Sequence, residues 1–411
     1  MYSFVLFAML AASPMTLPQI NSEVLANNPQ IRSAEHQTRI SKAKVGSAMA
    51  SDDPQFSYRA WGTPLLQPWN LNQTQHMFMF TENIPSRGKR ELQFLIASDD
   101  IEIQAMAVEA KKREVLAMAH QAFNQLLRSS AQLRIHHDEV RLAEQTIEAT
   151  RIQYTAGKAL QSDVLKAGVA YSRLAEHQIT IEREADSARG VLNSLMGLPP
   201  DQPLEVQGEY AILDVLPSLN ALQSLASANR PELLQLVLME KQAGRKVELA
   251  RKSLSPEYSI TAGYTLMPGG SEHRNGWIGE MSMTLPRLNR GKHDSEIQQA
   301  QEERDAITAE FQAQLSSITQ EIRESFIRAE SARKIVELYR DILRPDTANV
   351  SKAATVAYQT EQSGLLSVLD SQSMSIEVEY VLFDALATYE QSVADMERAI
   401  GVSLPGERKP L

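Results

Sequence analysis

The sequence contains no cysteine among its 411 residues. Disulfide bonds and zinc sites built on thiolates are therefore excluded, and an N-terminal lipid anchor on cysteine is not expected. The chain also lacks an excess of basic residues, since its formal net charge is -10. Without a basic patch to neutralise phosphates, a nucleic-acid partner is not expected.

Long hydrophobic runs are nearly absent as well. The single extended apolar run covers residues 4–12, which is too short to cross a bilayer as a helix. It has the length of a signal-peptide core, and Ala11, Ala12 and Ser13 offer small side chains for cleavage. We therefore expect residues 1–13 to be a signal peptide, and the lack of a basic segment before this core is consistent with a truncated start. If the protein crosses a membrane, it does so with β-strands.

Two related segments indicate a tandem duplication. Residues 154–165 contain Tyr154, Gly157 and Asp163 and end in Val-Leu, and residues 358–370 repeat the tyrosine and the Val-Leu pair 204 positions later, ending in Asp370. Both segments interrupt long helical patterns, so each is expected to turn the chain back on itself. We expect residues 14–205 to form the first structural repeat and residues 206–411 the second.

Each repeat is expected to contain a helix, a β-hairpin, a long helix, a tip turn and a closing helix. The hairpin, long helix, turn and closing helix are placed at 54–84, 88–154, 154–165 and 163–196 in the first repeat, and at 256–286, 291–358, 358–370 and 367–400 in the second. Pro29 and Pro231 are expected to restart the opening helices, because proline is tolerated in a first helical turn. Each long helix of about 66 residues spans roughly 100 Å, which two shorter helices stacked end to end would match. This predicts a rod with strands at one end and turns at the other.

The hairpin segments show the period of β-strands. From Tyr258 to Leu266 apolar and small or polar residues alternate strictly, and the length suits a tilted strand that crosses a membrane. Four strands cannot close into a barrel, and open strand edges are not tolerated in lipid. We therefore expect several chains to pool their strands. The fold class is mainly α-helical with a small antiparallel β part.

Proline and glycine mark the end of each hairpin. Pro85 and Pro286 are each followed by the triad Arg-Gly-Lys, which contains Gly88 and Gly291. We expect these residues to form strand-to-helix corners, with the basic side chains near a membrane interface. Ser86-x-x-Lys89 has the spacing of some acyl-transfer enzymes, but the second repeat lacks that serine. We therefore predict no catalytic residues and no enzyme activity.

These features together resemble the TolC-type outer membrane efflux proteins over essentially the whole chain. The resemblance lies in the Tyr-x-x-Gly…Asp-Val-Leu turn, the Asn-Pro restart, the duplicated element order and Met-Gly-Leu-Pro-Pro at the end of the first repeat. Gly88-Lys89-Arg90 and Leu343-Arg-Pro345 look most like the branch that serves heavy-metal efflux pumps. Unlike many relatives, the chain lacks a lipid-bearing cysteine.

The resemblance implies a homotrimer in the cell outer membrane, with a long periplasmic extension. Four strands from each chain would form a twelve-stranded transmembrane β-barrel, and the helices would form an α-barrel tunnel closed at its tip. A periplasmic adaptor protein and an inner-membrane pump of the RND type would load it for passive export, with heavy-metal cations as a candidate substrate class. The alternative is a soluble coiled-coil scaffold or adaptor-like protein, which explains the helices but not the four alternating strands.

The tip turns carry the candidate gate residues Tyr154, Gly157, Asp163, Tyr358 and Asp370. Asp163 has a second interpretation as a helix cap, and Asp370 as a carboxylate in a first helical turn. Glu361 and Ser363 stand where close TolC relatives have glycine and arginine, so the bonding network of the gate does not follow from the resemblance.

No metal site or cofactor is expected from the sequence. His136 and His137 are adjacent and so point to different faces of a helix, and no two histidines have the i,i+4 spacing that chelation on one helix needs.

Overall fold

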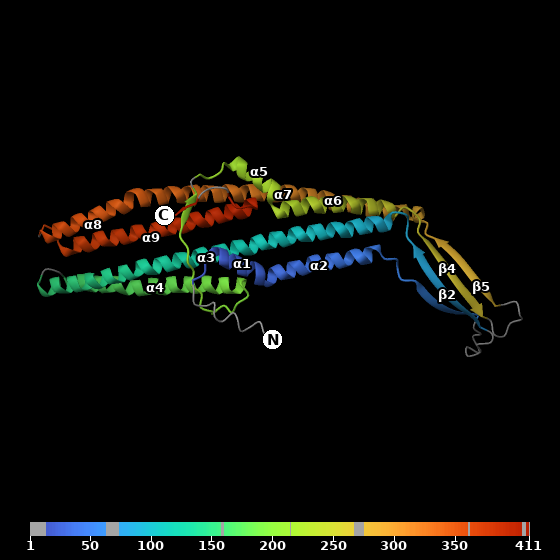
Figure 1. Cartoon of the computed structure of the whole chain (residues 1–411), viewed down its shortest axis with the longest axis horizontal. Coiled ribbons are helices and arrows are strands. Elements are labelled where there is room, and N and C mark those ends of the chain that lie inside the picture. The colour runs from blue at the N-terminus through green and yellow to red at the C-terminus, as the bar shows by residue number, and fades with distance from the viewer. Residues whose placement is uncertain are drawn as a thin grey trace. The chain divides into compact units, whose positions relative to one another are not determined.

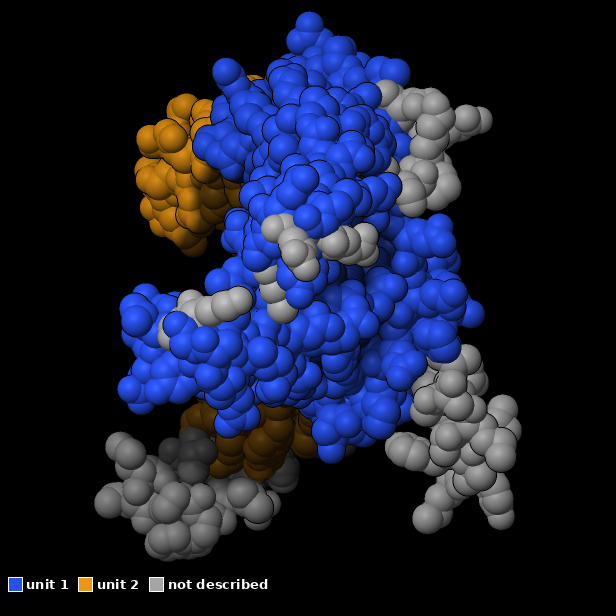
Figure 2. Space-filling model, turned by 90° about the vertical axis from the view of Figure 1, so that its left-hand side faces the viewer, with its two compact units in different colours: residues 1–33, 109–231, 315–411 blue, residues 34–108, 232–314 orange. Residues whose placement is uncertain are grey.

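The computed structural model describes residues 14–62, 74–157, 160–213, 215–266, 275–360, 362–404 and 408–410. The expected signal peptide lies outside these residues, as does most of both expected hairpin loops. The chain forms two compact units (Figure 2). The first unit contains residues 1–33, 109–231 and 315–411, and the second contains residues 34–108 and 232–314. The expected fold class, mainly helical with a small antiparallel sheet, is confirmed.

The first unit is built from long helices that pack in pairs (Figure 1). It holds α1 (Leu17–Asn27), most of α3 (Lys89–Thr155), α4 (Gln161–Leu195), α5 (Leu219–Asn229), the end of α7 (Arg290–Leu338), α8 (Arg344–Gln359) and α9 (Leu365–Ile400). Its core includes Ala119, Phe123 and Leu126 of α3, which are all buried. Two short strands that the sequence did not predict, β3 (Ala211–Leu213) and β6 (Arg408–Pro410), pair antiparallel in this unit.

The second unit contains the four expected strands. It holds most of α2 (Pro29–Met49), β1 (Gln55–Trp61), β2 (Gln75–Ile84), α6 (Pro231–Lys252), β4 (Tyr258–Leu266) and β5 (Gly276–Met283). The strands form one antiparallel sheet in the order β1-β2-β4-β5, so the two hairpins meet through β2 and β4. Asp99 of α3 is buried here, and its carboxylate accepts a hydrogen bond from Arg245 of α6 at 2.6 Å. The same carboxylate forms an ion pair with Lys241 of α6 at 3.3 Å.

The two faces of this sheet differ in chemistry. Residues paired directly across antiparallel strands lie on the same face, so Tyr58, Phe78, Tyr264 and Trp277 form one row, and their rings contact in pairs. The opposite face carries hydroxyl and amide groups that bond across the strands, as Thr81 does with Thr261 at 2.8 Å. On the apolar face large side chains remain exposed in the single chain: Phe56, Tyr58, Phe80, Ile260, Trp277 and Met281.

A buried polar side chain ties the first proline restart to the end of α4. Asn28 is 2 % exposed, and its Oδ1 accepts hydrogen bonds from the backbone N–H groups of Gln30 and Ile31, which caps α2. Its Nδ2 donates to the carbonyl of Leu195 at 2.9 Å. One side chain therefore forms hydrogen bonds with the free backbone N–H groups at the start of α2 and with a backbone carbonyl at the end of α4.

An arginine occupies the corresponding place in the second half. Arg230 precedes Pro231, is 5 % exposed and donates to the carbonyl of Ala399 at the end of α9 at 3.0 Å. Because this side chain is charged, it needs a counter-ion, and Glu321 of α7 accepts its hydrogen bond at 2.8 Å. Arg398 bonds the other oxygen of Glu321.

A glycine in the left-handed conformation closes each joint. Gly197 has a φ angle of +74° and Gly401 one of +77°, and residues with a Cβ atom rarely adopt such backbone angles. A Cβ on Gly401 would lie 2.8 Å from the carbonyl oxygen of Asn229, and one on Gly197 would lie 3.3 Å from that of Asn27. The backbone at Gly401 is therefore packed too closely for a Cβ, and at Gly197 the contact with a Cβ would be tight.

The long helix expected at 291–358 is interrupted. α7 ends at Leu338, a π-helical turn follows over Tyr339–Leu343, and α8 begins at Arg344. Pro345 lacks an N–H and its ring would clash with a carbonyl one α-helical turn earlier, so the wider turn before it relieves that conflict. α3 contains no proline and runs without interruption over 67 residues. In the described part of the chain, no helix has both the length and the apolar character needed to cross a membrane.

Candidate functional site

The first tip turn ends α3 with a glycine and starts α4 with a carboxylate. Gly157 has φ +70°, and its N–H donates to the carbonyl of Tyr154 at 3.0 Å. Asp163 is the third residue of α4, and its Oδ2 accepts a hydrogen bond from the backbone N–H of Leu160 at 3.1 Å. The Lys166 ammonium lies 3.8 Å from the same carboxylate. This geometry matches the capping interpretation of Asp163.

The second tip turn places Asp370 differently from the expectation. α9 begins at Leu365, after Gly364 in an extended conformation, which is two residues earlier than expected. Asp370 is therefore the sixth residue of the helix and lies in its second turn, too far along to cap it. Its carboxylate makes no hydrogen bond or ion pair with any residue that the structure describes. Glu361 lies outside the described residues.

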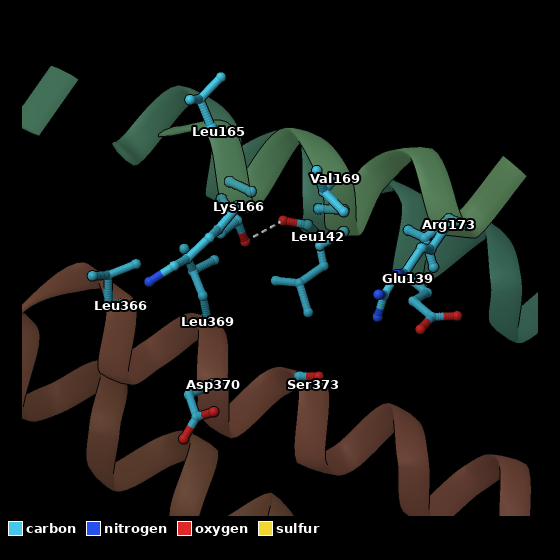
Figure 3. A pocket seen from close by; sticks show the side chains of 15 residues that line it. Glu139, Leu142, Leu165, Lys166, Val169, Arg173, Leu366, Leu369, Asp370 and Ser373 are labelled. Carbon is cyan, nitrogen blue, oxygen red and sulfur yellow. Dashed lines mark hydrogen bonds between the residues drawn. The ribbon is translucent and has the colours of Figure 1, made fainter. Parts of the chain in front are cut away.

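A groove of about 970 Å³ runs between α3, α4 and α9 behind the tip turns (Figure 3). Its apolar floor includes Leu142 and Leu369, which are buried and pack in one small cluster. Figure 3 shows the charged groups along it: Glu139, Lys166, Arg173 and Asp370.

The structure brings together only part of the expected gate. Asp370 and Lys166 line the groove. Asp163 does not line it, but its carboxylate lies 3.8 Å from the Lys166 ammonium. Tyr154 and Tyr358 are equally half-exposed, at 45 % and 44 %, and neither hydroxyl bonds to a described residue. The basic side chains of the groove, Lys166 and Arg173, were not predicted from the sequence. The i,i+3 spacing of Asp163 and Lys166 on one helix could have indicated that Lys166 lies near the tip turn.

The matches to known proteins cover almost the whole chain. The model of the outer membrane efflux protein family matches residues 20–198 and again residues 222–402. The chain belongs to this family. Its members are efflux channels of the outer membrane, not enzymes, so the expectation that the protein is not an enzyme is confirmed.

Individual relatives of this outer membrane efflux protein are distant in sequence but similar in fold. Outer membrane protein TolC of Escherichia coli is 18 % identical over 405 residues, which is 94 % of this chain and 82 % of TolC. The structure of the outer-membrane channel OprN has a TM-score of 0.77 at 18 % identity, with 94 % of this chain and 89 % of OprN covered. The Campylobacter jejuni CmeC outer membrane channel has a TM-score of 0.76 at 15 % identity, with 94 % and 85 % covered.

The two strand-to-helix corners of this efflux protein are built differently. After Pro85, Gly88 has φ +82°, and Lys89 forms a salt bridge with Glu257 beside β4. After β5, a 3₁₀ turn over Pro286–Asn289 leads directly into α7, and Gly291 is the second residue of that helix. The second corner therefore does not need a glycine at 291, contrary to the expected equivalence of the two triads.

We expect Gly88→Ala to destabilise the efflux protein by about 1–3 kcal/mol, because alanine must enter the left-handed region. Its new methyl group would meet the Lys252 Nζ only at 3.6 Å, so the loss would be conformational rather than steric. Gly291→Ala is the matched control and should be neutral or stabilising by about 0.5–1 kcal/mol, since its surroundings are open and its backbone is helical. Thermal unfolding of both variants in detergent measures the difference, and equal midpoints would contradict it.

Proposed function

We propose that the protein is the exit duct of a tripartite efflux system, through which substrates leave passively across the outer membrane. The observation that carries this proposal is the four-stranded sheet, whose two faces differ. One face bears the aromatic row and exposed aliphatic side chains, and on the other hydroxyl and amide groups bond across the strands beside Met77 and Met79. Exposed aromatic and aliphatic side chains on one face suit contact with lipid, and the hydrogen-bonded hydroxyl groups on the other suit an aqueous lumen. In a soluble scaffold these apolar side chains would instead be exposed to water.

The sheet also supports a trimer. Among the described residues β1 and β5 each pair with one neighbour only, which leaves two edges of the sheet open. Open edges in lipid leave backbone groups without hydrogen bonds, at a cost of several kcal/mol for each group. Three chains that contribute four strands each would close a twelve-stranded barrel and remove every edge. The two halves, residues 14–205 and 206–411, would then contribute one hairpin each.

The helical part would extend into the periplasm, where a periplasmic adaptor and an RND-type inner-membrane pump would load the duct. The tip turns would form its gate. Within that gate Asp370 is the stronger candidate for contact with cations, because its carboxylate lines the groove and is not engaged elsewhere. Asp163 would chiefly hold the start of α4.

For the membrane-facing role we expect Met281→Arg to reduce assembly strongly. Met281 is 70 % exposed on the apolar face of β5, and an arginine facing lipid costs about 2–4 kcal/mol near the membrane midplane. Ser282→Arg, one residue further on the polar face, is the matched control. The yield of detergent-extracted trimer is the measurement. Equal trimer yields for the two variants, or wild-type protein that stays in the soluble fraction, would refute the proposal.

For the gate we expect Asp370→Asn to weaken block by multivalent cations at least about tenfold and to reduce cation selectivity. Three carboxylates around a shared axis attract such cations, as charged rings do in cation channels. Asp163→Asn should change both properties much less, since asparagine retains an acceptor for the Leu160 N–H. Conductance in planar bilayers provides the test, and a larger effect at Asp163 than at Asp370 would reverse the assignment.

For the substrate we propose heavy-metal cations, on the basis of Gly88-Lys89-Arg90 and Leu343-Arg-Pro345. A strain without the gene should then become sensitive to divalent transition-metal salts and regain resistance when the gene is restored. Sensitivity confined to organic compounds would exclude this substrate class while leaving the exit-duct proposal intact.

A further inference from the structure

Three potential metal ligands from two helices converge in the first unit. His136 and Glu139 lie one turn apart on α3, and His177 lies on α4. One ligand atom from each residue lies within 4.8 Å of the other two. The His136 Nδ1 and a Glu139 carboxylate oxygen are 3.7 Å apart, and the two imidazole rings meet edge to face at 5.7 Å. Two ligands of a tetrahedral zinc ion are about 3.3 Å apart, so small side-chain rotations would complete the geometry.

His136 itself indicates a missing partner. The side chain is 1 % exposed, and neither ring nitrogen has a hydrogen-bond partner in the structure. A buried polar group without a partner costs free energy that native proteins seldom leave uncompensated. An imidazole nitrogen that makes no hydrogen bond has a lone pair available for a metal ion.

The surroundings also fit a metal site. The hydroxyl of Tyr380 on α9 donates to the Glu139 carboxylate at 3.3 Å, and the Tyr380 ring packs against His177. An outer partner of this kind orients a ligating carboxylate. Glu139 also lines the groove described above, which gives a cation access from solvent.

We propose that His136, Glu139 and His177 bind one divalent first-row transition-metal ion, such as Zn²⁺. Two imidazoles and one carboxylate match the preference of zinc, cobalt and nickel ions rather than that of Mg²⁺ or Ca²⁺. The bound ion would link α3 to α4, and through Tyr380 it would also involve α9. This inference goes beyond the proposed export function and holds whichever substrate the duct carries.

The test uses the full-length protein in detergent, free of any histidine tag, titrated with Zn²⁺ against a chromogenic chelator. We expect one Zn²⁺ per chain. His177→Asn and Glu139→Gln should weaken binding more than about 100-fold, and Tyr380→Phe about 10–100-fold, the range for loss of an outer partner. His137→Asn is the matched control, because this exposed neighbour lies outside the cluster and should bind as the wild type does.

A second readout uses Co²⁺, whose visible absorption reports coordination by the protein directly. The wild type and His137→Asn should show the same intense spectrum, and His177→Asn should lose it while its circular dichroism and elution volume stay unchanged. Wild-type protein that binds no stoichiometric metal would overturn the proposal. So would His177→Asn and Glu139→Gln variants that retain wild-type affinity.

Discussion

The arrangement of the first unit depends on how buried backbone groups are satisfied where a helix restarts at a proline. At both restarts the chain must supply a cap for the new helix and a donor for the last carbonyls of a neighbouring one. The first half meets this need with Asn28, a neutral side chain that does both. In the second half Arg230 supplies only the donor, to the Ala399 carbonyl, because a guanidinium has no acceptor with which to cap a helix. Its buried charge requires Glu321 beside it.

The two solutions differ in what they demand of the rest of the chain. Removing one partner of a buried ion pair typically costs 3–5 kcal/mol, because the remaining charge stays buried and unpaired. An amide hydrogen bond contributes about 1 kcal/mol. The second joint is thus coupled to α7 and α9 through Glu321 and Arg398, whereas the first joint is local to α2 and α4. We therefore expect the two halves to respond differently to mutation at these joints, although their element order is the same.

Predictions from the sequence succeeded where the period of the hydrophobic pattern, or a single residue type, determines the secondary structure. Alternation from Tyr258 to Leu266 predicted a strand, and the structure has one at those residues. They failed where the outcome depends on contacts from distant segments. β3 and β6 are three residues each and exist only as a pair, so neither has a pattern of its own. The histidine cluster was missed because the search assumed one helix, while His177 comes from the next.

The π-helical turn of the second half has a consequence for how the two halves correspond. Ala119 and Phe123 of α3 correspond to the residues 203 positions later, Ile322 and Phe326 of α7, and Ala119 and Ile322 are both fully buried. Tyr154 and Tyr358 at the tip turns are 204 positions apart. Between these two matched positions the second half is therefore one residue longer than the first, and the turn at Tyr339–Leu343 lies within that interval. A π turn accommodates one extra residue without rotating the helix on either side. The turn thus takes up the one-residue difference locally, so that the residues before and after it can keep equivalent packing positions in the two halves.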